Sequence, residues 1–236
     1  MLSGKPPTEK QKMRKVESST EMGKSAIMQK VCDSTLYGIV DLGYVAPDAV
    51  AEMTKALVEG GVQLLQLRAK NHASSEVERL ARLILPITRA AGIPLIINDH
   101  PQVAAQVGSE GIHVGQDDLS VAETRAIVGS NCFVGKSTHS LAQARAAMEE
   151  GADYIGFGPL FATGTKPDYV PIGLQDIAIV EGFATVPVFC IGGVNQERLP
   201  LVLAAGAKRV VVVSAFLQAA NVRAAVRQLA NALPEL

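Results

Sequence analysis

The sequence predicts an α/β fold, a (β/α)₈ barrel in which eight parallel strands close into a ring inside a layer of helices. Apolar, β-branched runs of the kind that form strands buried on both faces recur along the chain. A helical pattern follows each of them, and one strand–helix unit takes roughly 25 residues. A doubly wound sheet is the main rival, but no Gly-x-Gly-x-x-Gly turn follows the first expected strand. Together these observations favour the barrel.

The strands are predicted from short apolar runs bounded by turn residues. Seven of these runs end in polar or glycine residues, which places those residues along one rim of a barrel, where such folds keep their chemistry. The expected strands are Leu36–Asp41, Gln63–Ala69, Pro94–Asp99, Gly111–Gly115, Cys132–Ser137, Tyr154–Gly158, Pro187–Ile191 and Arg209–Val213.

The helices are predicted from their start and stop residues. Ser120 with Glu123 three residues later is a capping box, and Gly60-Gly61, Gly151 and Gly206 are typical of helix ends. The expected helices are Asp48–Glu59, Ser75–Ala91, Gln102–Val107, one that begins at Ser120, Ala142–Glu150, Leu174–Glu181, Gln196–Ala205 and Ala219–Leu233.

Composition limits the function classes. The 236 residues are 48% hydrophobic and suit one large domain, and no stretch approaches the ~20 apolar residues of a membrane helix. Residues 1–30 carry a net charge of +4, which leaves −5 on the rest, and an acidic body argues against nucleic acid as a partner. Cys32, Cys132 and Cys190 fit no metal spacing, so we expect free thiols in a reducing cytoplasm. Whether the chain forms a homo-oligomer stays open.

The first residues are unlike the rest. Residues 1–33 are polar and lack apolar periodicity, so we expect a disordered extension, with the barrel occupying residues 34–236. The extension has no central apolar run, which argues against a secretory signal peptide. Its three glutamates argue against an organellar transit peptide.

Carboxylates close two neighbouring strands. Asn98-Asp99 ends the third expected strand, and Asp117-Asp118 follows the fourth, so these side chains should meet at the rim. Magnesium characteristically takes one or two protein carboxylates together with substrate phosphates. Alternatively, Asp118 and Asp99 merely cap the helices that follow them. Both interpretations remain open on these residues alone.

Basic residues favour the metal interpretation. Arg68 and Lys70 end the second strand, Lys136 lies in the fifth, and Lys166 ends the loop after the sixth. A single lysine is more often a solvated surface charge. Several cations beside a carboxylate pair form the kind of site that binds a diphosphate and stabilises its departure.

A second anion site is predicted after the last strands. Gly192-Gly193 and Ser214 follow strands seven and eight, where barrels often bind phosphate through backbone N–H groups. Gly-Gly also forms ordinary tight turns, so the pair is weak evidence without Val213-Ser214 in the next unit.

Histidines are less informative. His113, inside an apolar run, is more readily a packed residue than a base, whereas His139 lies near the rim and could touch a substrate. The Ser137 and Thr138 hydroxyls suit phosphate binding better than nucleophilic attack, because the sequence shows no catalytic dyad.

The strand-end motifs resemble those of the thiamine-phosphate synthase family, from Leu36 to Leu233. They recur in order as QLRxK at Gln66–Lys70, ND at Asn98-Asp99, HVGQxD at His113–Asp118, GxSTH at Gly135–His139, GPxFxTxTK at Gly158–Lys166, IGG at Ile191–Gly193 and VxS at Val212–Ser214. The resemblance implies a TIM-barrel transferase that joins 4-amino-2-methyl-5-hydroxymethylpyrimidine diphosphate to a thiazole phosphate, giving thiamine phosphate and pyrophosphate. The diphosphate would leave first, and the thiazole nitrogen would capture the pyrimidine cation.

The resemblance also implies roles for individual residues. Asp99 and Asp118 would bind Mg²⁺, and Arg68, Lys70, Ser137 and Lys166 would form the catalytic set. The pyrimidine diphosphate would be bound by Gln66, Leu67, Arg68, Ala69, Lys70, Asn98, Ser137 and Lys166, and the thiazole phosphate by Thr163, Gly164, Thr165, Gly193, Val213 and Ser214.

The chain differs from the family pattern at one residue, and two alternative functions remain open. The family usually has a glutamate where this chain has Ala69, which puts any role of that acid in doubt. A thiazole tautomerase of the same superfamily is one alternative, but it has no diphosphate to expel and would not need Lys70, Asp118 and Lys166 together. The other alternative is a non-catalytic barrel that binds a phosphorylated ligand.

Overall fold

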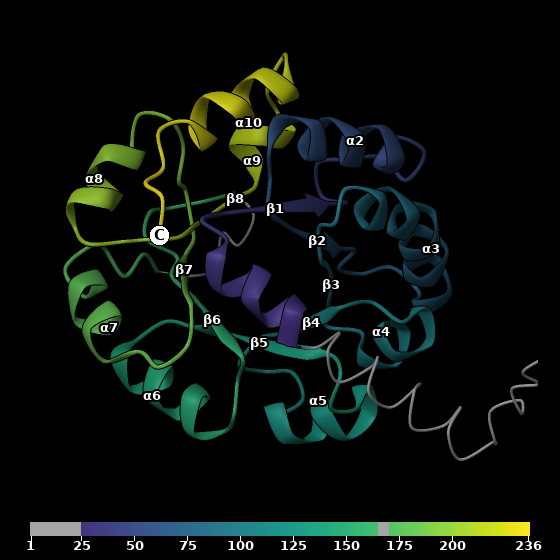
Figure 1. Ribbon diagram of the computed structural model, residues 1–236, viewed down its shortest axis with the longest axis horizontal. Coiled ribbons are helices and arrows are strands. Elements are labelled where there is room, and N and C mark those ends of the chain that lie inside the picture. The colour runs from purple at the N-terminus through teal and green to yellow at the C-terminus, as the bar shows by residue number, and fades with distance from the viewer. Residues whose placement is uncertain (1–24, 165–169) are drawn as a thin grey trace, which may run out of the picture.

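The eight strands form a closed barrel in a computed structural model that describes residues 25–164 and 170–236. Their order around the ring is that of the sequence, and every neighbouring pair is parallel, which confirms the predicted (β/α)₈ fold (Figure 1). The strands are β1 Leu36–Asp41, β2 Leu64–Arg68, β3 Leu95–Asn98, β4 Gly111–Val114, β5 Phe133–Thr138, β6 Tyr154–Phe157, β7 Val188–Cys190 and β8 Val210–Val212.

Helices surround the barrel as an outer ring (Figure 1). The predicted capping box is present, because Ser120 Oγ accepts from the Glu123 amide and the Glu123 carboxylate accepts from the Ser120 amide. The labelled helices are α2 Val50–Gly60, α3 Ser74–Ala90, α4 Pro101–Val107, α5 Val121–Val128, α6 Leu141–Glu149, α7 Ile177–Phe183, α8 Leu199–Ala204, α9 Ser214–Leu217 and α10 Val222–Ala230.

The C-terminal segment differs from the prediction of one helix over Ala219–Leu233. A short helix, α9, begins directly after β8 at Ser214, and α10 starts only at Val222. The reason is a local cap, since the Asn221 side chain accepts from the Ala224 amide and so starts a new helix there.

The barrel interior is aromatic at its centre. Tyr37, Phe133, Tyr154 and Phe189 are almost fully buried. The Tyr154 ring makes edge contacts with the other three at centroid distances of 5.6–6.1 Å. Aromatic pairs in this arrangement stabilise a core beyond their buried area. They therefore form a rigid floor beneath the carboxyl ends of the strands.

Residues 25–33 correct the expected boundary of the extension. The sequence predicts disorder over residues 1–33, but residues 25–33 form a helix, and residues 1–24 lie outside the described part of the chain. Val31 is fully buried, Lys30 Nζ donates to Gly92 O at 2.7 Å, and Arg209 Nη2 donates to Cys32 O at 2.7 Å. Gly92 and Arg209 precede β3 and β8, so the helix lies across the amino-terminal end of the barrel (Figure 1).

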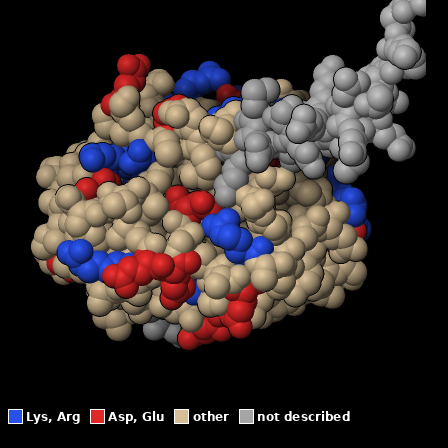
Figure 2. Space-filling view, turned by 60° about the horizontal axis from the view of Figure 1, so that its bottom comes forward, with Lys and Arg blue, Asp and Glu red and all other residues tan. Residues whose placement is uncertain are grey.

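The surface carries charges of both signs. On the face shown in Figure 2, acidic and basic side chains lie side by side on a largely uncharged surface. Residues 25–164 and 170–236 contain no helix with the length and apolar composition needed to cross a bilayer.

Candidate active site

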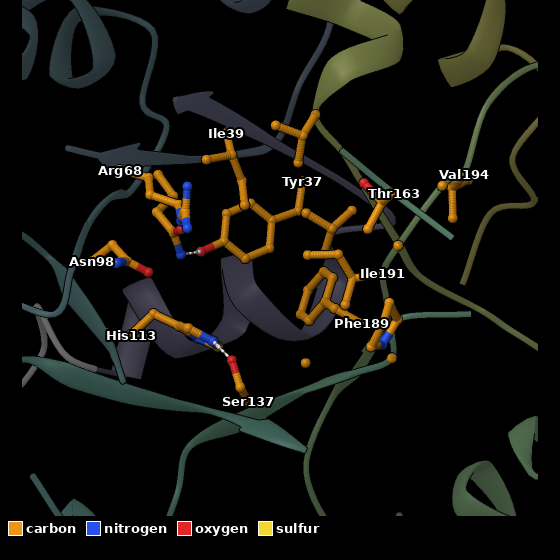
Figure 3. A pocket seen from close by; sticks show the side chains of 18 of the residues that line it. Tyr37, Ile39, Arg68, Asn98, His113, Ser137, Thr163, Phe189, Ile191 and Val194 are labelled. Atoms are coloured by element: carbon orange, nitrogen blue, oxygen red, sulfur yellow. Dashed lines mark hydrogen bonds between the residues drawn. The ribbon is translucent and has the colours of Figure 1, made fainter. Parts of the chain in front are cut away.

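Two adjoining cavities lie at the carboxyl ends of the strands. The interior cavity encloses about 870 Å³ including its open mouth. The rim cavity lies beside it, and Arg68, Asn98 and Ser137 line both. These three side chains therefore form the boundary between a mainly apolar chamber and a charged one. Figure 3 shows Arg68 and Asn98 on one side of the interior cavity and Thr163 and Val194 on the other.

Asp99 and Asp118 face each other across the rim cavity. Burial, followed by the hydrogen bond and charge of Asp118, raises the pKa of Asp99 to about 6. Neither residue is a helix cap, because the capping residues of α4 and α5 are His100 and Ser120. Instead, one oxygen of Asp118 accepts from the Gly115 amide at 2.7 Å. The capping interpretation of the two aspartates is therefore wrong.

Asp99 has an unusual backbone. Its φ of 60° lies in the left-handed region, which residues other than glycine rarely adopt and which concentrates at functional sites. The Asp99 amide still donates to His113 O at 2.9 Å, which continues the β3–β4 ladder one residue past β3. The turn thus comes directly at the strand end, where it directs the carboxylate toward Asp118.

The donor set of the rim cavity fits magnesium. It offers two carboxylates close enough to repel, and a hard cation would relieve that repulsion. Within the described residues, no three His, Cys, Asp or Glu side chains gather into a metal cluster. A cation here would therefore complete its shell with water and a substrate phosphate, which is the usual arrangement for Mg²⁺.

The predicted cations separate into three cases. Arg68 and Lys70 line the rim cavity, where the charge of Lys70 lowers the pKa of Asp99. Lys136 is buried and lines neither cavity, because alternate residues of β5 face opposite sides and Ser137 takes the inward position. Its expected place on the rim is wrong. Lys166 and Thr165 lie outside the described residues.

Strand alternation also separates the residues of Gln66–Lys70. Gln66 and Arg68 face the interior cavity, whereas Leu67 and Ala69 are buried and line neither cavity. The latter two side chains pack in the core, so any contact with a substrate would have to come from their backbone.

A buried chain of hydrogen bonds crosses the floor of the interior cavity. Gln66 Nε2 donates to Tyr37 Oη at 2.7 Å, and Tyr37 Oη lies 3.1 Å from Tyr154 Oη. His113 Nδ1 lies 2.9 Å from Tyr154 Oη, and His113 Nε2 lies 2.9 Å from Ser137 Oγ (Figure 3). Burial is the main cause that raises the pKa of both tyrosines. We call these five residues the buried relay.

The His113–Ser137 contact corrects the statement that no dyad is present. In a serine hydrolase the histidine takes the serine proton and a carboxylate stabilises the resulting imidazolium. Here the other ring nitrogen faces Tyr154, a neutral phenol whose raised pKa keeps it protonated. The pair therefore lacks the group that would activate Ser137 as a nucleophile, and phosphate binding remains the better role for its hydroxyl.

The opposite wall is formed by the loops after β7 and β8. Gly193, Val213 and Ser214 line the interior cavity, as predicted for an anion site. Gly192 and Gly193 have φ values of 101° and 70°, and a Cβ at Gly192 would lie 2.4 Å from Pro159 Cα. Glycine is therefore required for the loop to lie this close to its neighbour.

Arg198 stabilises the loop that follows β7. Its guanidinium donates to Gly193 O at 2.9 Å and lies 4.7 Å from the centroid of the Phe161 ring. Thr163 lines the cavity beside it, whereas Gly164 is exposed and does not. His139 also lines the cavity, and its Nδ1 contacts Gly158 O.

Sequence reasoning missed Tyr37, Tyr154, Asp41 and Arg198. The tyrosines lie in apolar runs and read as core residues. Asp41 had a usable signal, because it ends the first strand just as Arg68 ends the second, and the two are register partners.

Comparison with known proteins agrees with this geometry. A family model described as thiamine monophosphate synthase matches residues 36–216. Thiamine-phosphate synthase of Chloroflexus aurantiacus is 40% identical over 200 residues, which cover 84% of this chain and 92% of that protein. The enzyme of the same name from Pelotomaculum thermopropionicum is 37% identical, covering 84% and 91%.

Solved structures give the same result. Thiamine phosphate pyrophosphorylase from Pyrococcus furiosus superposes with a TM-score of 0.78 at 29% identity, covering 86% of this chain and 96% of that one. A 3-hexulose-6-phosphate synthase, at 18% identity and a TM-score of 0.61, shares the fold alone. The extent of the family match and the identity to these relatives show that the chain belongs to the thiamine monophosphate synthase family.

Proposed function

We propose that this protein condenses 4-amino-2-methyl-5-hydroxymethylpyrimidine diphosphate with a thiazole phosphate, releasing thiamine phosphate and pyrophosphate. The observation that carries the proposal is the pair of cavities joined at Arg68, Asn98 and Ser137. A substrate with a flat ring at one end and a diphosphate at the other can place each part in the chamber that suits it.

The rim cavity suits the diphosphate. Arg68 and Lys70 supply positive charge, and Ser137 supplies a hydroxyl donor. Asp99 and Asp118 would bind Mg²⁺, which when bound neutralises charge on the departing diphosphate. Lys166 would add a further cation, by resemblance to the family.

The interior cavity suits the reacting rings. The C–O bond of the pyrimidine substrate breaks with its electron pair going to the diphosphate, and the thiazole nitrogen lone pair then forms the new C–N bond. Phe189, Ile191 and Val211 line this cavity and exclude water that would otherwise capture the cation. The catalytic contribution is positioning and charge stabilisation rather than proton transfer.

The thiazole phosphate is assigned to the opposite wall. Gly193, Val213 and Ser214 would bind its phosphate through backbone N–H groups and the serine hydroxyl, with Thr163 beside them. Gly164 and Thr165 remain part of the proposed set by resemblance. A thiazole tautomerase would use this wall but not the charged rim cavity, so the rim cavity favours the synthase.

A direct assay tests the proposal. Purified protein receives both substrates with Mg²⁺ or with a chelator, and thiamine phosphate and pyrophosphate are quantified. We expect both products in equal amounts with Mg²⁺ and a loss of at least tenfold with the chelator. Absence of product with Mg²⁺ would refute the synthase, and binding without turnover would support the non-catalytic barrel. Isomerisation of the thiazole phosphate alone would identify a tautomerase.

We also propose a cytoplasmic location, which the three free cysteines support. Counting free thiols after freshly isolated protein is denatured without reductant would test it, because a secreted protein would be expected to pair two of the three and two of them are buried in the fold.

A further inference from the structure

The buried relay connects two groups that face the interior cavity. Gln66 and Ser137 stand at its ends, on β2 and β5, and both line the cavity. Tyr37, Tyr154 and His113 link them through the barrel interior, with at most 9% of each residue exposed. All five residues line the interior cavity, so a ring that fills the cavity leaves these hydrogen bonds without competing water. The donor and acceptor roles along the chain are therefore coupled.

The charge at the Ser137 end sets the direction of the relay. A phosphate oxygen only accepts hydrogen bonds, so a diphosphate in the rim cavity requires Ser137 to donate its proton to it. Ser137 Oγ must then accept from His113 Nε2–H, and His113 Nδ1 must accept from Tyr154. The Tyr154 oxygen is left to accept from Tyr37.

The same direction fixes the amide of Gln66. Tyr37 donates to Tyr154, so its oxygen accepts from Gln66 Nε2, which is the arrangement found in the structure. A glutamine amide with no fixed partner can rotate by half a turn and exchange the positions of its oxygen and nitrogen. If the Gln66 amide rotated, its oxygen would face the Tyr37 hydroxyl. That hydroxyl already donates its only proton to Tyr154, so the two oxygens would have no hydrogen bond between them.

A fixed amide distinguishes two closely related rings. An aminopyrimidine presents an N–H donor beside a ring-nitrogen acceptor, whereas its oxo counterpart presents an acceptor beside a ring N–H. The two edges are mirror patterns, and one amide orientation matches only one of them. A mismatch leaves buried polar groups unpaired, which costs far more than the loss of one exposed hydrogen bond.

We propose that the buried relay makes this site selective for the 4-amino over the 4-oxo pyrimidine, with Tyr37, Tyr154 and His113 as positioning residues. The inference rests on the proposed function, because it takes the diphosphate and the ring to occupy the two cavities assigned to them.

Dissociation constants of the 4-amino and 4-oxo pyrimidine diphosphates, measured by calorimetry with Mg²⁺, test the inference without requiring turnover. Tyr154→Phe removes the central hydroxyl and keeps the ring contacts with Phe133 and Phe189. We expect the wild type to prefer the amino compound on the order of 10- to 100-fold, and the variant to lose most of that preference. Affinity for inorganic pyrophosphate, which has no ring, should stay within about twofold.

A double variant separates coupling from general damage. If Tyr37 and Tyr154 act through one chain, Tyr37→Phe combined with Tyr154→Phe should lose no more selectivity than either change alone. Thr54→Val is the matched control, because it removes a buried α2 hydroxyl that has no hydrogen-bond partner and lies outside both cavities.

The outcomes are distinguishable. An amino-to-oxo ratio unchanged in Tyr154→Phe, or additive losses in the double variant, would overturn the relay. Nitrogen-15 spectra with pyrophosphate bound should show His113 as the neutral tautomer protonated on Nε2, and the opposite tautomer would overturn its direction. Failure of the wild type to form thiamine phosphate while retaining the ratio would instead refute the proposed function alone.

Discussion

The carboxylate of Asp41 holds the guanidinium of Arg68 at 2.6 Å, across the register pair that joins the ends of β1 and β2. Both side chains are largely buried, and the other Asp41 oxygen accepts from the Gly43 amide at 2.9 Å. Because the carboxylate occupies one edge of the guanidinium, the remaining N–H donors stay available at the boundary of the two cavities.

Asp41→Asn should therefore weaken diphosphate binding indirectly, because Asp41 contacts Arg68 and not the substrate. We expect a rise on the order of tenfold in KM for the pyrimidine diphosphate and a loss of roughly 1–3 kcal/mol in unfolding free energy, because Arg68 loses its counter-charge in a buried setting. Steady-state kinetics and urea denaturation measure the two effects. Glu78→Gln, which breaks the exposed pair with Arg82, should change neither by more than about 0.5 kcal/mol.

Asp99→Asn should stabilise the metal-free protein while removing activity. The pKa of Asp99 is raised above its ordinary value of 3.8, so its contribution favours the fold below that pH and is lost as pH rises toward 6. At pH 7 the charged group opposes folding, and a neutral amide, which also tolerates a left-handed backbone, removes that penalty.

Calorimetric melting temperatures with chelator and turnover with Mg²⁺ test this pair of effects. A higher melting temperature with at least tenfold lower turnover is the expected result. Glu150→Gln, an exposed carboxylate at the end of α6, should alter neither quantity. A variant that melts lower than the wild type would contradict the repulsion between Asp99 and Asp118.

Arg198→Met should affect the thiazole side selectively. The change removes the hydrogen bond that holds Gly193 O and replaces the guanidinium over the Phe161 ring with an uncharged apolar chain. We expect KM for the thiazole phosphate to rise by about threefold to tenfold, as a single lost hydrogen bond would produce. KM for the pyrimidine diphosphate should stay constant, and an equal rise for both substrates would show that Arg198 supports the whole fold instead.

Alkaline pH should destabilise the barrel through Cys190. Burial first, and the charge of Glu181 second, raise the pKa of this thiol from 9.0 to about 12. Its contribution to stability is complete below pH 9 and is lost as pH rises toward 12, because only the unfolded chain releases the proton in that interval. Unfolding free energy should fall by as much as ~1.4 kcal/mol per pH unit from this group.

Comparison with Cys190→Ala isolates that slope. The variant should be less stable at pH 8 because of the cavity it creates, but it should lose stability more slowly between pH 9 and 11. Parallel curves for the two proteins would show that Cys190 does not contribute. The buried tyrosines add the same kind of slope above pH 10 in both proteins.

The barrel and one side of its site were predictable because they rest on periodic signals. Apolar runs predict the strands, and a polar residue at the end of each run predicts the rim, so Arg68, Asp99 and Ser214 could be placed without coordinates. Lys136 could not be placed, because the face of a strand on which a residue lies depends on register, and a shift of one residue reverses it.

Contacts between strands that are distant in the sequence could not be predicted from it. Tyr37 and Tyr154 are 117 positions apart, and each alone is indistinguishable from a packed aromatic residue. The helix of residues 25–33 was missed for a related reason, since so short a segment is not a stable helix by itself and gains its stability from the barrel end that it covers.

That helix has a consequence for how substrates enter the protein and how products leave it. It lies across the amino-terminal end of the barrel, where Lys30 Nζ donates to Gly92 O and Arg209 Nη2 donates to Cys32 O of the helix, and the interior cavity lies at the opposite end. The two substrates must therefore enter, and the two products must leave, through the opening at the carboxyl ends of the strands.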